Sequence, residues 1–370
     1  MAKKEKKKKK RQSGIIQTLN AMLSLIVLGL VAVGALFYYA IVQFNKPGQI
    51  AEDTVFAVSE GSGLNSVAGE LEAQGIIDNR YIFRFGAVAH ELNKGLKRGE
   101  YLLPANASMK EVLDTLVNGR PVQYDVTIPE GFTSWQVVER LLAHEDLTGE
   151  IAERPAEGSL LPNTYSFERG TDRQVIIDEM KKAQADALEQ IWAGRDQNIP
   201  IETKEELVIL ASIVEEEAGG VDDRPLVAGV FINRLNKGMR LQSDPTIIYG
   251  ITKGEGTLGR GLKRSEIDAK TDYNTYQIDG LPPGPISNPG LEALKAVANP
   301  EATDALFFVA DGQGGHAFAV TYDEHQKNVA AWRKIEQERA KIAEEAAKAA
   351  AEAAKAAEEE AAKAESDQNN

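Results

Sequence analysis

The chain has 370 residues, enough for two domains and accessory segments, and 43% hydrophobic with 26% charged residues is typical of a globular protein. Its net charge of −14 is uneven: residues 1–14 carry eight basic residues against one acid, so the remainder is strongly acidic and nucleic acid is excluded as its main partner. There is no cysteine, and none of the four histidines has the spacing of a metal motif. We therefore expect neither a metal site nor a cofactor.

A basic segment, residues 1–14, precedes a predicted membrane anchor, residues 15–44. Within the anchor, the run Ala21–Val42 has Ser24 as its one clearly polar side chain, and it is long enough to cross about 30 Å of hydrocarbon as a helix. The alternative is a cleaved signal peptide, but the run is longer than a usual signal and lacks a good cleavage site. Basic residues mark the cytoplasmic side of a span. We expect a single-pass membrane protein whose N-terminus is cytoplasmic and whose remainder lies across the membrane.

After a linker, residues 45–52, a pattern of strand, turn and helix recurs three times in residues 53–150. The strands are predicted at Thr54–Val58, Tyr101–Leu103 and Asp125–Ile128. Capping boxes begin the second and third helices, at Ser108 with Glu111 and at Thr133 with Gln136. Small β/α units of this kind usually bind or position other molecules, and nothing in them indicates catalysis.

Residues 151–335 combine helices with long Gly/Pro-rich segments, for example GLPPGPISNPG at Gly280–Gly290. These segments hold Asn, Gln, Ser and Tyr with few charges, which is typical either of groove walls or of turns packed on a core. Such side chains hydrogen-bond hydroxyls and acetamides, and aromatic rings stack on sugars, so a sugar polymer suits them better than a nucleotide. The absence of GxSxG argues against a serine hydrolase, and the glycine-rich GEGTLGRG does not follow a strand and open a helix.

The helix that begins after Thr203 is the most informative part of this region. Thr203 with Glu206 forms a capping box at its start, and Gly219 and Gly220 are expected to end it. At roughly 100° per residue, one broad apolar face is formed by Leu207, Ile209, Leu210, Ala211, Ile213 and Val214.

Three consecutive acids at the end of this helix point in different directions. Glu216 is predicted on the polar side, Glu215 at the edge, and Glu217 inside the apolar face. Desolvation disfavours a charged carboxylate, so the pKa of Glu217 should be raised and its carboxyl group could hold a proton near neutral pH. A general acid uses such a proton to protonate a leaving oxygen. The alternative is that the helix frays and Glu217 simply reaches water.

From the anchor to about Arg333, the chain resembles the membrane-anchored endolytic murein transglycosylases, the YceG-like family. The resemblance rests on ASIVEEEAG, VFINRL, GMRLQSDPTIIYG, YNTY, GLPPGPISNPG and FVADGQGGHAF, in that order. It implies a LysM-like domain at residues 53–150 and a catalytic transglycosylase domain at residues 151–335. The family's catalytic glutamate is the last acid of its ASIVEKE motif, which corresponds to Glu217. One departure is Asn163 in LLPNTY, where the family commonly has Asp, so the role of that side chain stays open.

The resemblance implies cleavage of the β-1,4 bond between N-acetylmuramic acid and N-acetylglucosamine in nascent peptidoglycan strands. Glu217 would protonate the leaving oxygen and then act as base while the muramyl 6-hydroxyl closes onto C1, leaving a 1,6-anhydro end. The candidate groove residues, each with a purely structural role as the alternative, are Gln242, Tyr273, Asn274, Ser287, His316 and Asn233. Peptidoglycan strands and the membrane are the implied partners, with peptidoglycan synthases as further candidates.

Two other functions remain open: a muramidase that hydrolyses the same bond, with Asp244 or Asp272 acting on a water, and a non-catalytic glycan-binding scaffold. The expected fold class is α+β, with one transmembrane helix, a small LysM-like β/α domain and a mixed α/β catalytic domain that carries the glutamate helix. Residues 336–370 are rich in Ala, Glu and Lys without a large apolar stripe, which predicts a solvated helical tail.

Overall fold

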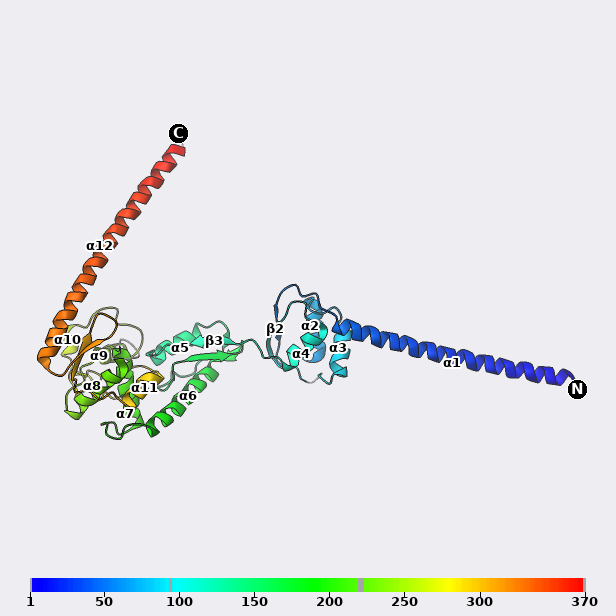
Figure 1. Cartoon of the computed structure of the whole chain (residues 1–370), viewed down its shortest axis with the longest axis horizontal. Coiled ribbons are helices and arrows are strands. Elements are labelled where there is room, and N and C mark those ends of the chain that lie inside the picture. The colour runs from blue at the N-terminus through cyan, green and yellow to red at the C-terminus, as the bar shows by residue number, and fades with distance from the viewer. Residues whose placement is uncertain (1, 93–94, 219–222, 369–370) are drawn as a thin grey trace. The chain divides into compact units, whose positions relative to one another are not determined.

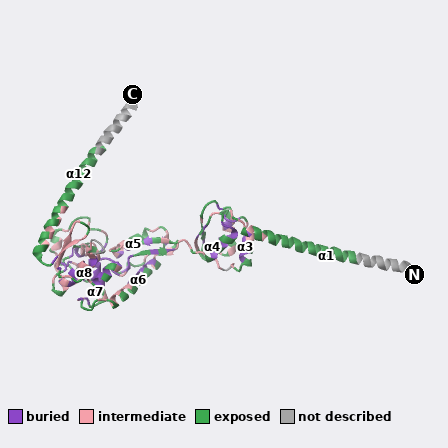
Figure 2. Cartoon of the chain, viewed as in Figure 1, coloured by how far each residue is buried: buried purple, intermediate pink, exposed green. Residues whose placement is uncertain are grey.

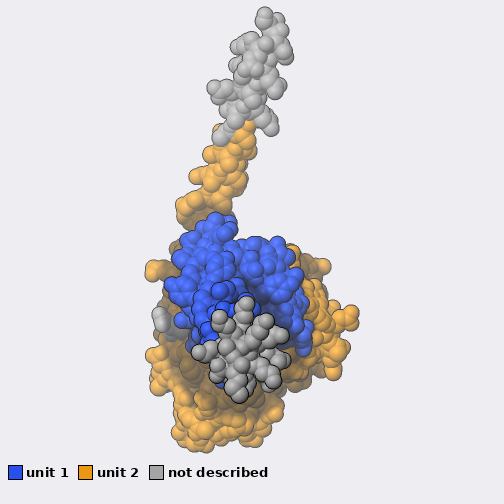
Figure 3. Space-filling model, turned by 90° about the vertical axis from the view of Figure 1, so that its right-hand side faces the viewer, with its two compact units in different colours: residues 1–124, 166–169 blue, residues 125–165, 170–370 orange. Residues whose placement is uncertain are grey.

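The computed structural model describes residues 2–92, 95–218 and 223–368 of a mixed α/β chain. The chain forms two compact units. Unit 1 comprises residues 1–124 and 166–169, and unit 2 comprises residues 125–165 and 170–370 (Figures 1 and 3). The strands pair two by two, as β1 with β2, β3 with β5, β4 with β6 and β7 with β8. Helices therefore supply most of the packing in each unit.

Unit 1 begins with the long helix α1 (Ala2–Asn45), whose section Ile16–Asn45 is long and apolar enough to span a membrane. Its large apolar side chains are exposed along this section (Figure 2). Soluble proteins rarely expose so many apolar side chains together, whereas a membrane span does so throughout. The end of the helix differs, because Phe44 is 4% exposed and belongs to the core of unit 1.

The rest of unit 1 is a strand, two helices, a second strand and a third helix. In order they are β1 (Thr54–Val58), α2 (Leu64–Ala73), α3 (Arg80–Ala89), β2 (Gly99–Leu103) and α4 (Met109–Asn118). β1 and β2 pair antiparallel, with Phe56 opposite Tyr101, and both of these rings are buried. The predicted capping box begins α4. Helix α3 was not predicted; Asn79 caps it by accepting hydrogen bonds from the amides of Tyr81 and Ile82.

The elements from β3 onward are β3 (Tyr124–Thr127), α5 (Ser134–Leu142), β4 (Leu147–Thr148), β5 (Thr164–Phe167), β6 (Thr171–Asp172), α6 (Arg173–Ala193), α7 (Lys204–Glu217), α8 (Arg224–Asn236), α9 (Asp244–Thr252), α10 (Arg264–Ile267), α11 (Leu291–Ala298), β7 (Phe307–Ala310), β8 (His316–Ala319) and α12 (Tyr322–Gln368). We expected the third strand–helix pair, β3 and α5, to group with the first two. The division falls after Tyr124 instead, and α5 lies in unit 2.

Hydrogen bonds explain why α5 groups with unit 2. The turn before it is joined to the segment that precedes α11: Gly131 N donates to Asn288 O, and Asn288 N donates to Phe132 O. Ser134 N at the start of α5 donates to the Glu157 carboxylate at 2.6 Å. These bonds link residues more than twenty positions apart, so the hydrophobic spacing within the repeat could not reveal them.

Helix α7 is the centre of unit 2. The predicted capping box of Thr203 and Glu206 is present, but the prediction of a single apolar face is wrong, because every residue from Leu207 to Val214 is buried. Helices α8 and α11 pack on it, and their side chains join its own in one core. The helix ends at Glu217 with Ala218 as its C-cap; the predicted stop at Gly219 and Gly220 lies outside the described residues.

The tail forms the predicted helix, α12, and its first turns are attached to the β7–β8 hairpin. A Cβ on Gly312 would lie 2.9 Å from the Ile335 side chain, and Arg339 donates a hydrogen bond to the Gly312 carbonyl. Residues 340–352 are exposed, so the solvated part of the tail begins after Arg339. The attached part therefore extends slightly further than the sequence resemblance.

Candidate active site

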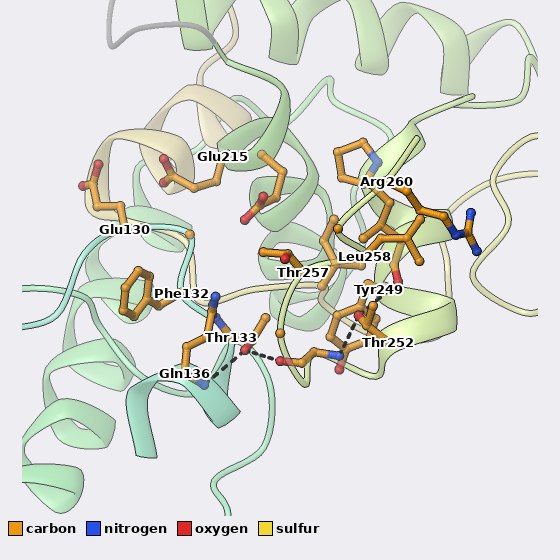
Figure 4. A pocket seen from close by; sticks show the side chains of 18 residues that line it. Glu130, Phe132, Thr133, Gln136, Glu215, Tyr249, Thr252, Thr257, Leu258 and Arg260 are labelled. Atoms are coloured by element: carbon orange, nitrogen blue, oxygen red, sulfur yellow. Dashed lines mark hydrogen bonds between the residues drawn. The ribbon is translucent and has the colours of Figure 1, made fainter. Parts of the chain in front are cut away.

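A cavity of about 540 Å³ lies in unit 2 beside the C-terminal end of α7. The turn after β3 supplies Glu130 and Phe132 to one side, and the glycine-rich segment after α9 supplies Leu258 and Arg260 to the other (Figure 4). Its other lining residues include Thr133, Gln136, Glu215, Glu216, Tyr249 and Thr257. The pocket thus combines carboxylates, hydroxyls, an aromatic ring and one guanidinium group, which suits a polar, hydroxyl-rich ligand.

Glu215 is held in an ion pair, which corrects its predicted place at the edge of the helix. Its side chain is 4% exposed and pairs with Arg224, and its second oxygen accepts a hydrogen bond of 2.8 Å from Gly290 N. Arg224 also donates to Glu130 at 3.0 Å. A buried carboxylate with these partners is fixed in position, so Glu215 acts as a support for the pocket wall.

Glu216 is exposed, as predicted, and it lines the pocket. Its pKa is raised to about 7, above all by burial of the carboxyl group among protein atoms, and further by the charges of Glu215 and Glu217. A hydrogen bond with Ser287 opposes this rise. Glu216 is therefore a second titrating carboxyl group at neutral pH, which sequence reasoning had placed outside the site.

Glu217 is half-buried, and its Oε1 accepts a hydrogen bond of 2.7 Å from Ser243 Oγ. Its pKa is raised to about 7, chiefly by burial and also by the nearby Asp244 carboxylate, while the Ser243 hydroxyl and the Arg234 guanidinium oppose the rise. The raised pKa expected from the helix periodicity is thus confirmed. The side chain is directed toward the start of α9 and is absent from the lining of the pocket in Figure 4.

Buried threonine hydroxyl groups hold the backbone of Ser243 in place. Ser243 N donates to Thr275 Oγ1 at 2.9 Å, and Thr246 Oγ1 donates to Ser243 O at 2.7 Å. Next to it, Tyr276 OH donates to Asp244 Oδ1 at 2.7 Å. Sequence reasoning named Asp244 only for the alternative muramidase. It missed Ser243, Thr246, Thr275 and Tyr276, although all four stand in the QSDPT and YNTY segments that carried the family resemblance.

Three of the predicted groove residues lie around these glutamates. Gln242 is exposed directly beside Ser243, with a φ of 53°. Tyr273 is half-buried, and its ring centroid is 5.0 Å from that of the pocket residue Tyr249. Ser287 is fully buried and is the hydrogen-bond partner of Glu216. They are placed to support or border the site.

The other three predicted residues are occupied within the fold. The Asn274 side chain is fully buried and donates to three backbone carbonyls, those of Glu266, Ile267 and Ala269. Asn233 donates to the carbonyls of Thr303 and Ala305. His316 Nδ1 lies 3.1 Å from a carboxylate oxygen of Asp223. Each of these side chains connects backbone segments, which is the structural alternative that the sequence left open.

Two acids that sequence reasoning did not select also belong to this region. Burial raises the pKa of Glu130, helped by Glu215 and opposed by Arg224. Burial likewise raises the pKa of Glu157, which accepts hydrogen bonds from Ser134 N and from Tyr249 OH. Within the part of the chain that the structure describes, no group of three His, Asp or Glu side chains could hold a metal ion.

The site thus combines carboxyl groups of raised pKa with hydroxyl donors in a mixed α/β unit, preceded in the chain by a candidate membrane helix. The chain belongs to the YceG-like family, whose model matches residues 56–331. This region holds both the α7 glutamates and the walls of the pocket.

Relatives from Streptococcus pneumoniae and Bacillus subtilis carry the name endolytic murein transglycosylase. The one from Streptococcus pneumoniae is 33% identical over 322 residues, which cover 74% of this chain and 57% of that protein. The one from Bacillus subtilis is 30% identical over 302 residues, which cover 73% of this chain and 82% of that protein. The chain therefore spans about 57% of the length of the pneumococcal relative. A crystal structure of a YceG-like protein from Listeria monocytogenes is 29% identical, covers 75% of this chain and 98% of that one, and has a TM-score of 0.47.

Proposed function

We propose that this protein is an endolytic murein transglycosylase, a lyase that cleaves the β-1,4 bond between N-acetylmuramic acid and N-acetylglucosamine in nascent peptidoglycan. Membership of the YceG-like family and the names of the relatives support the reaction class. The observation that carries the proposal is the half-buried Glu217, with its pKa near 7 and a hydroxyl donor on one of its oxygens. Cleavage within nascent strands would limit their elongation.

Glu217 is the proposed catalytic residue. Ser243 donates to Oε1, so in the neutral acid the proton resides on Oε2. From there it is transferred to the leaving oxygen as the bond to C1 of the muramyl unit breaks. The resulting carboxylate then removes the proton of the muramyl 6-hydroxyl as that oxygen bonds to C1, which yields a 1,6-anhydro end and regenerates the acid. A pKa near 7 serves both steps, because both protonation states are accessible at neutral pH.

We propose that unit 1 from residue 53 onward contains the LysM-like part, which holds glycan near the catalytic unit. Its support is a separate core of its own, built from β1, β2 and three helices. We further propose that α1 anchors the chain in the inner membrane with its N-terminus in the cytoplasm, because eight basic residues precede the apolar section. A reporter fused after Asn370 should then be active in the periplasm alone. Activity of that fusion in the cytosol would contradict the orientation.

A muramidase remains the second candidate, since Asp244 lies close enough to raise the pKa of Glu217 and could orient a water. The two reactions differ in their products. Purified protein would be incubated with uncross-linked glycan strands in ¹⁸O-labelled water, and the fragments analysed by mass spectrometry. We expect unlabelled 1,6-anhydro ends. Labelled reducing ends would instead identify the muramidase, and intact strands would favour a glycan-binding scaffold.

A further inference from the structure

Helix α3 carries apolar residues on two sides. Its core-facing side consists of Phe83, Gly86 and Ala87. Its other side exposes Tyr81, Phe85 and Val88, by 61%, 39% and 59%. These three positions follow the spacing i, i+4 and i+7, so they form one stripe along the helix. A continuous apolar stripe on a surface helix is typical of a helix face that contacts another apolar surface, such as a protein or a lipid bilayer.

The stripe lies directly beside the candidate membrane helix. The rings of Phe37 in α1 and Phe85 in α3 pack edge to face, with centroids 5.2 Å apart. Two turns later, Phe44 enters the core against Gly86, where a Cβ would lie 2.2 Å from the phenyl ring. Figure 1 shows α3 beside the end of α1. Unit 1 and the end of α1 are therefore joined by close packing.

The depth of this contact indicates what covers the stripe. Phe37 lies five residues before Val42, the end of the apolar run, which corresponds to about 7.5 Å along a helix. A side chain that touches Phe37 must lie at a similar depth when the run spans a bilayer. Interfacial helices bury their apolar face to about 5–10 Å. Lys46 and Asp78 form an ion pair of 2.7 Å just past the end of α1, consistent with a polar headgroup level there.

We propose that α3 is an interfacial helix whose stripe of Tyr81, Phe85 and Val88 inserts into the outer leaflet of the bilayer that α1 spans. The partner is the acyl-chain and headgroup region of the lipid. This inference rests on the membrane anchor of the proposed function and is independent of the catalytic chemistry. Insertion of the stripe would hold unit 1 on the membrane surface, so the glycan that this unit contacts would be held close to the bilayer.

The chain has no cysteine, so one introduced cysteine gives one defined fluorescent label. The full chain with Val88→Cys would carry a polarity-sensitive dye in vesicles of phosphatidylethanolamine and phosphatidylglycerol, with or without nitroxide-labelled acyl chains. Leu102→Cys is the matched control, because Leu102 is apolar and 51% exposed on β2, which Figure 1 shows on the side of unit 1 away from α1. Leu30→Cys, within the apolar run, reports on the anchor.

We expect the Val88 label to show blue-shifted emission and strong nitroxide quenching, at least threefold stronger than the Leu102 label. Water-like emission at Val88 together with a quenched Leu30 label would overturn the inference and leave the anchor intact. An unquenched Leu30 label would show that α1 does not span the bilayer, which would overturn both the anchor and this inference. The cleavage assay tests the proposed reaction separately and does not depend on this result. A Val88 blue shift that disappears on dilution into excess lipid would mean that a second copy covers the stripe, which also overturns the proposal.

Discussion

Ser243 Oγ donates a hydrogen bond of 2.7 Å to Glu217 Oε1, across 26 residues of chain. This bond favours the charged carboxylate, whereas burial favours the neutral acid, and the balance sets the pKa near 7. Without the serine hydroxyl, burial would act with less opposition. The protonation state of the proposed catalytic residue is therefore controlled by a neighbour that can be removed without changing the acid itself.

Ser243→Ala should raise the pKa of Glu217 further, because the lost hydrogen bond stabilised the charged form. The general-acid step requires the protonated form, which is lost as pH rises through the folded pKa. The alkaline limb of the kcat profile for strand cleavage should therefore move to higher pH. Ser66→Ala is the control, since Ser66 Oγ makes the same kind of bond, 2.8 Å to Glu70, in unit 1. An unchanged alkaline limb in Ser243→Ala would show that Ser243 does not influence the pKa of the group that titrates there.

Glu217→Gln keeps the size of the side chain but supplies no proton, so kcat for strand cleavage should fall by roughly 10²–10⁴-fold. Glu216→Gln should behave differently, because Glu216 lines the pocket: we expect a raised KM with kcat largely kept. Both variants would be assayed on the same glycan strands. The reverse pattern, a lost kcat in Glu216→Gln and near-normal cleavage by Glu217→Gln, would transfer the acid role to Glu216.

The stability of the protein should depend on the protonation of Glu217. Its folded pKa of about 7 lies above the ordinary 4.5, so the folded state holds the extra proton between these values. Stability should therefore fall as pH rises from about 4.5 to about 7 and then level off. Glu217→Gln removes this contribution. The Tm of the variant relative to the wild type should increase between pH 5 and pH 8, and a constant difference would show that Glu217 titrates normally.

Arg224→Met should lower the free energy of unfolding by about 3–5 kcal/mol, because it leaves the buried Glu215 carboxylate without its partner. The double variant Arg224→Met with Glu215→Met removes both charges and should recover much of the loss. Arg154→Ala is the control: its pair with Glu255 is exposed and should contribute about 0–1 kcal/mol. Denaturant unfolding measures all three. Equal losses for Arg224→Met and Arg154→Ala would contradict a buried pair.

Truncation of the tail should be tolerated only beyond its attached turns. A chain ending at Ile342 keeps Ile335 and Arg339 against the β7–β8 hairpin and should match the full chain in Tm and cleavage. A chain ending at Arg333 loses both contacts and should melt several degrees lower. A comparable Tm drop for the longer truncation would mean that the exposed residues pack on the protein after all.

Local features were predictable from the sequence. The capping boxes at Ser108, Thr133 and Thr203 are present, because each depends on residues three positions apart. The raised pKa of Glu217 followed from its place among apolar neighbours on one helix. The membrane-span candidate followed from composition alone.

Features that depend on distant partners were not predictable. Glu215 is buried because Arg224 and Gly290 N meet it, and neither neighbour is visible in the helix pattern. The single apolar face assigned to α7 was wrong because α8 and α11 pack on the helix, and Val208 and Ser212 are buried along with the predicted residues. Glu130 stands in a turn that the sequence grouped with a binding repeat. The hydrogen bond that it accepts from Arg224, which is distant in sequence, holds it in the pocket wall.

The burial of residues 207–214 in α7 has a consequence for how the protein loses activity on heating. A helix enclosed on all sides exchanges its amide protons chiefly through global unfolding, so its terminal acids keep their positions until the whole unit melts. Thermal inactivation should therefore coincide with the calorimetric transition of unit 2. The amides of α7 should be among the slowest in hydrogen exchange, and those of the exposed α12 tail among the fastest.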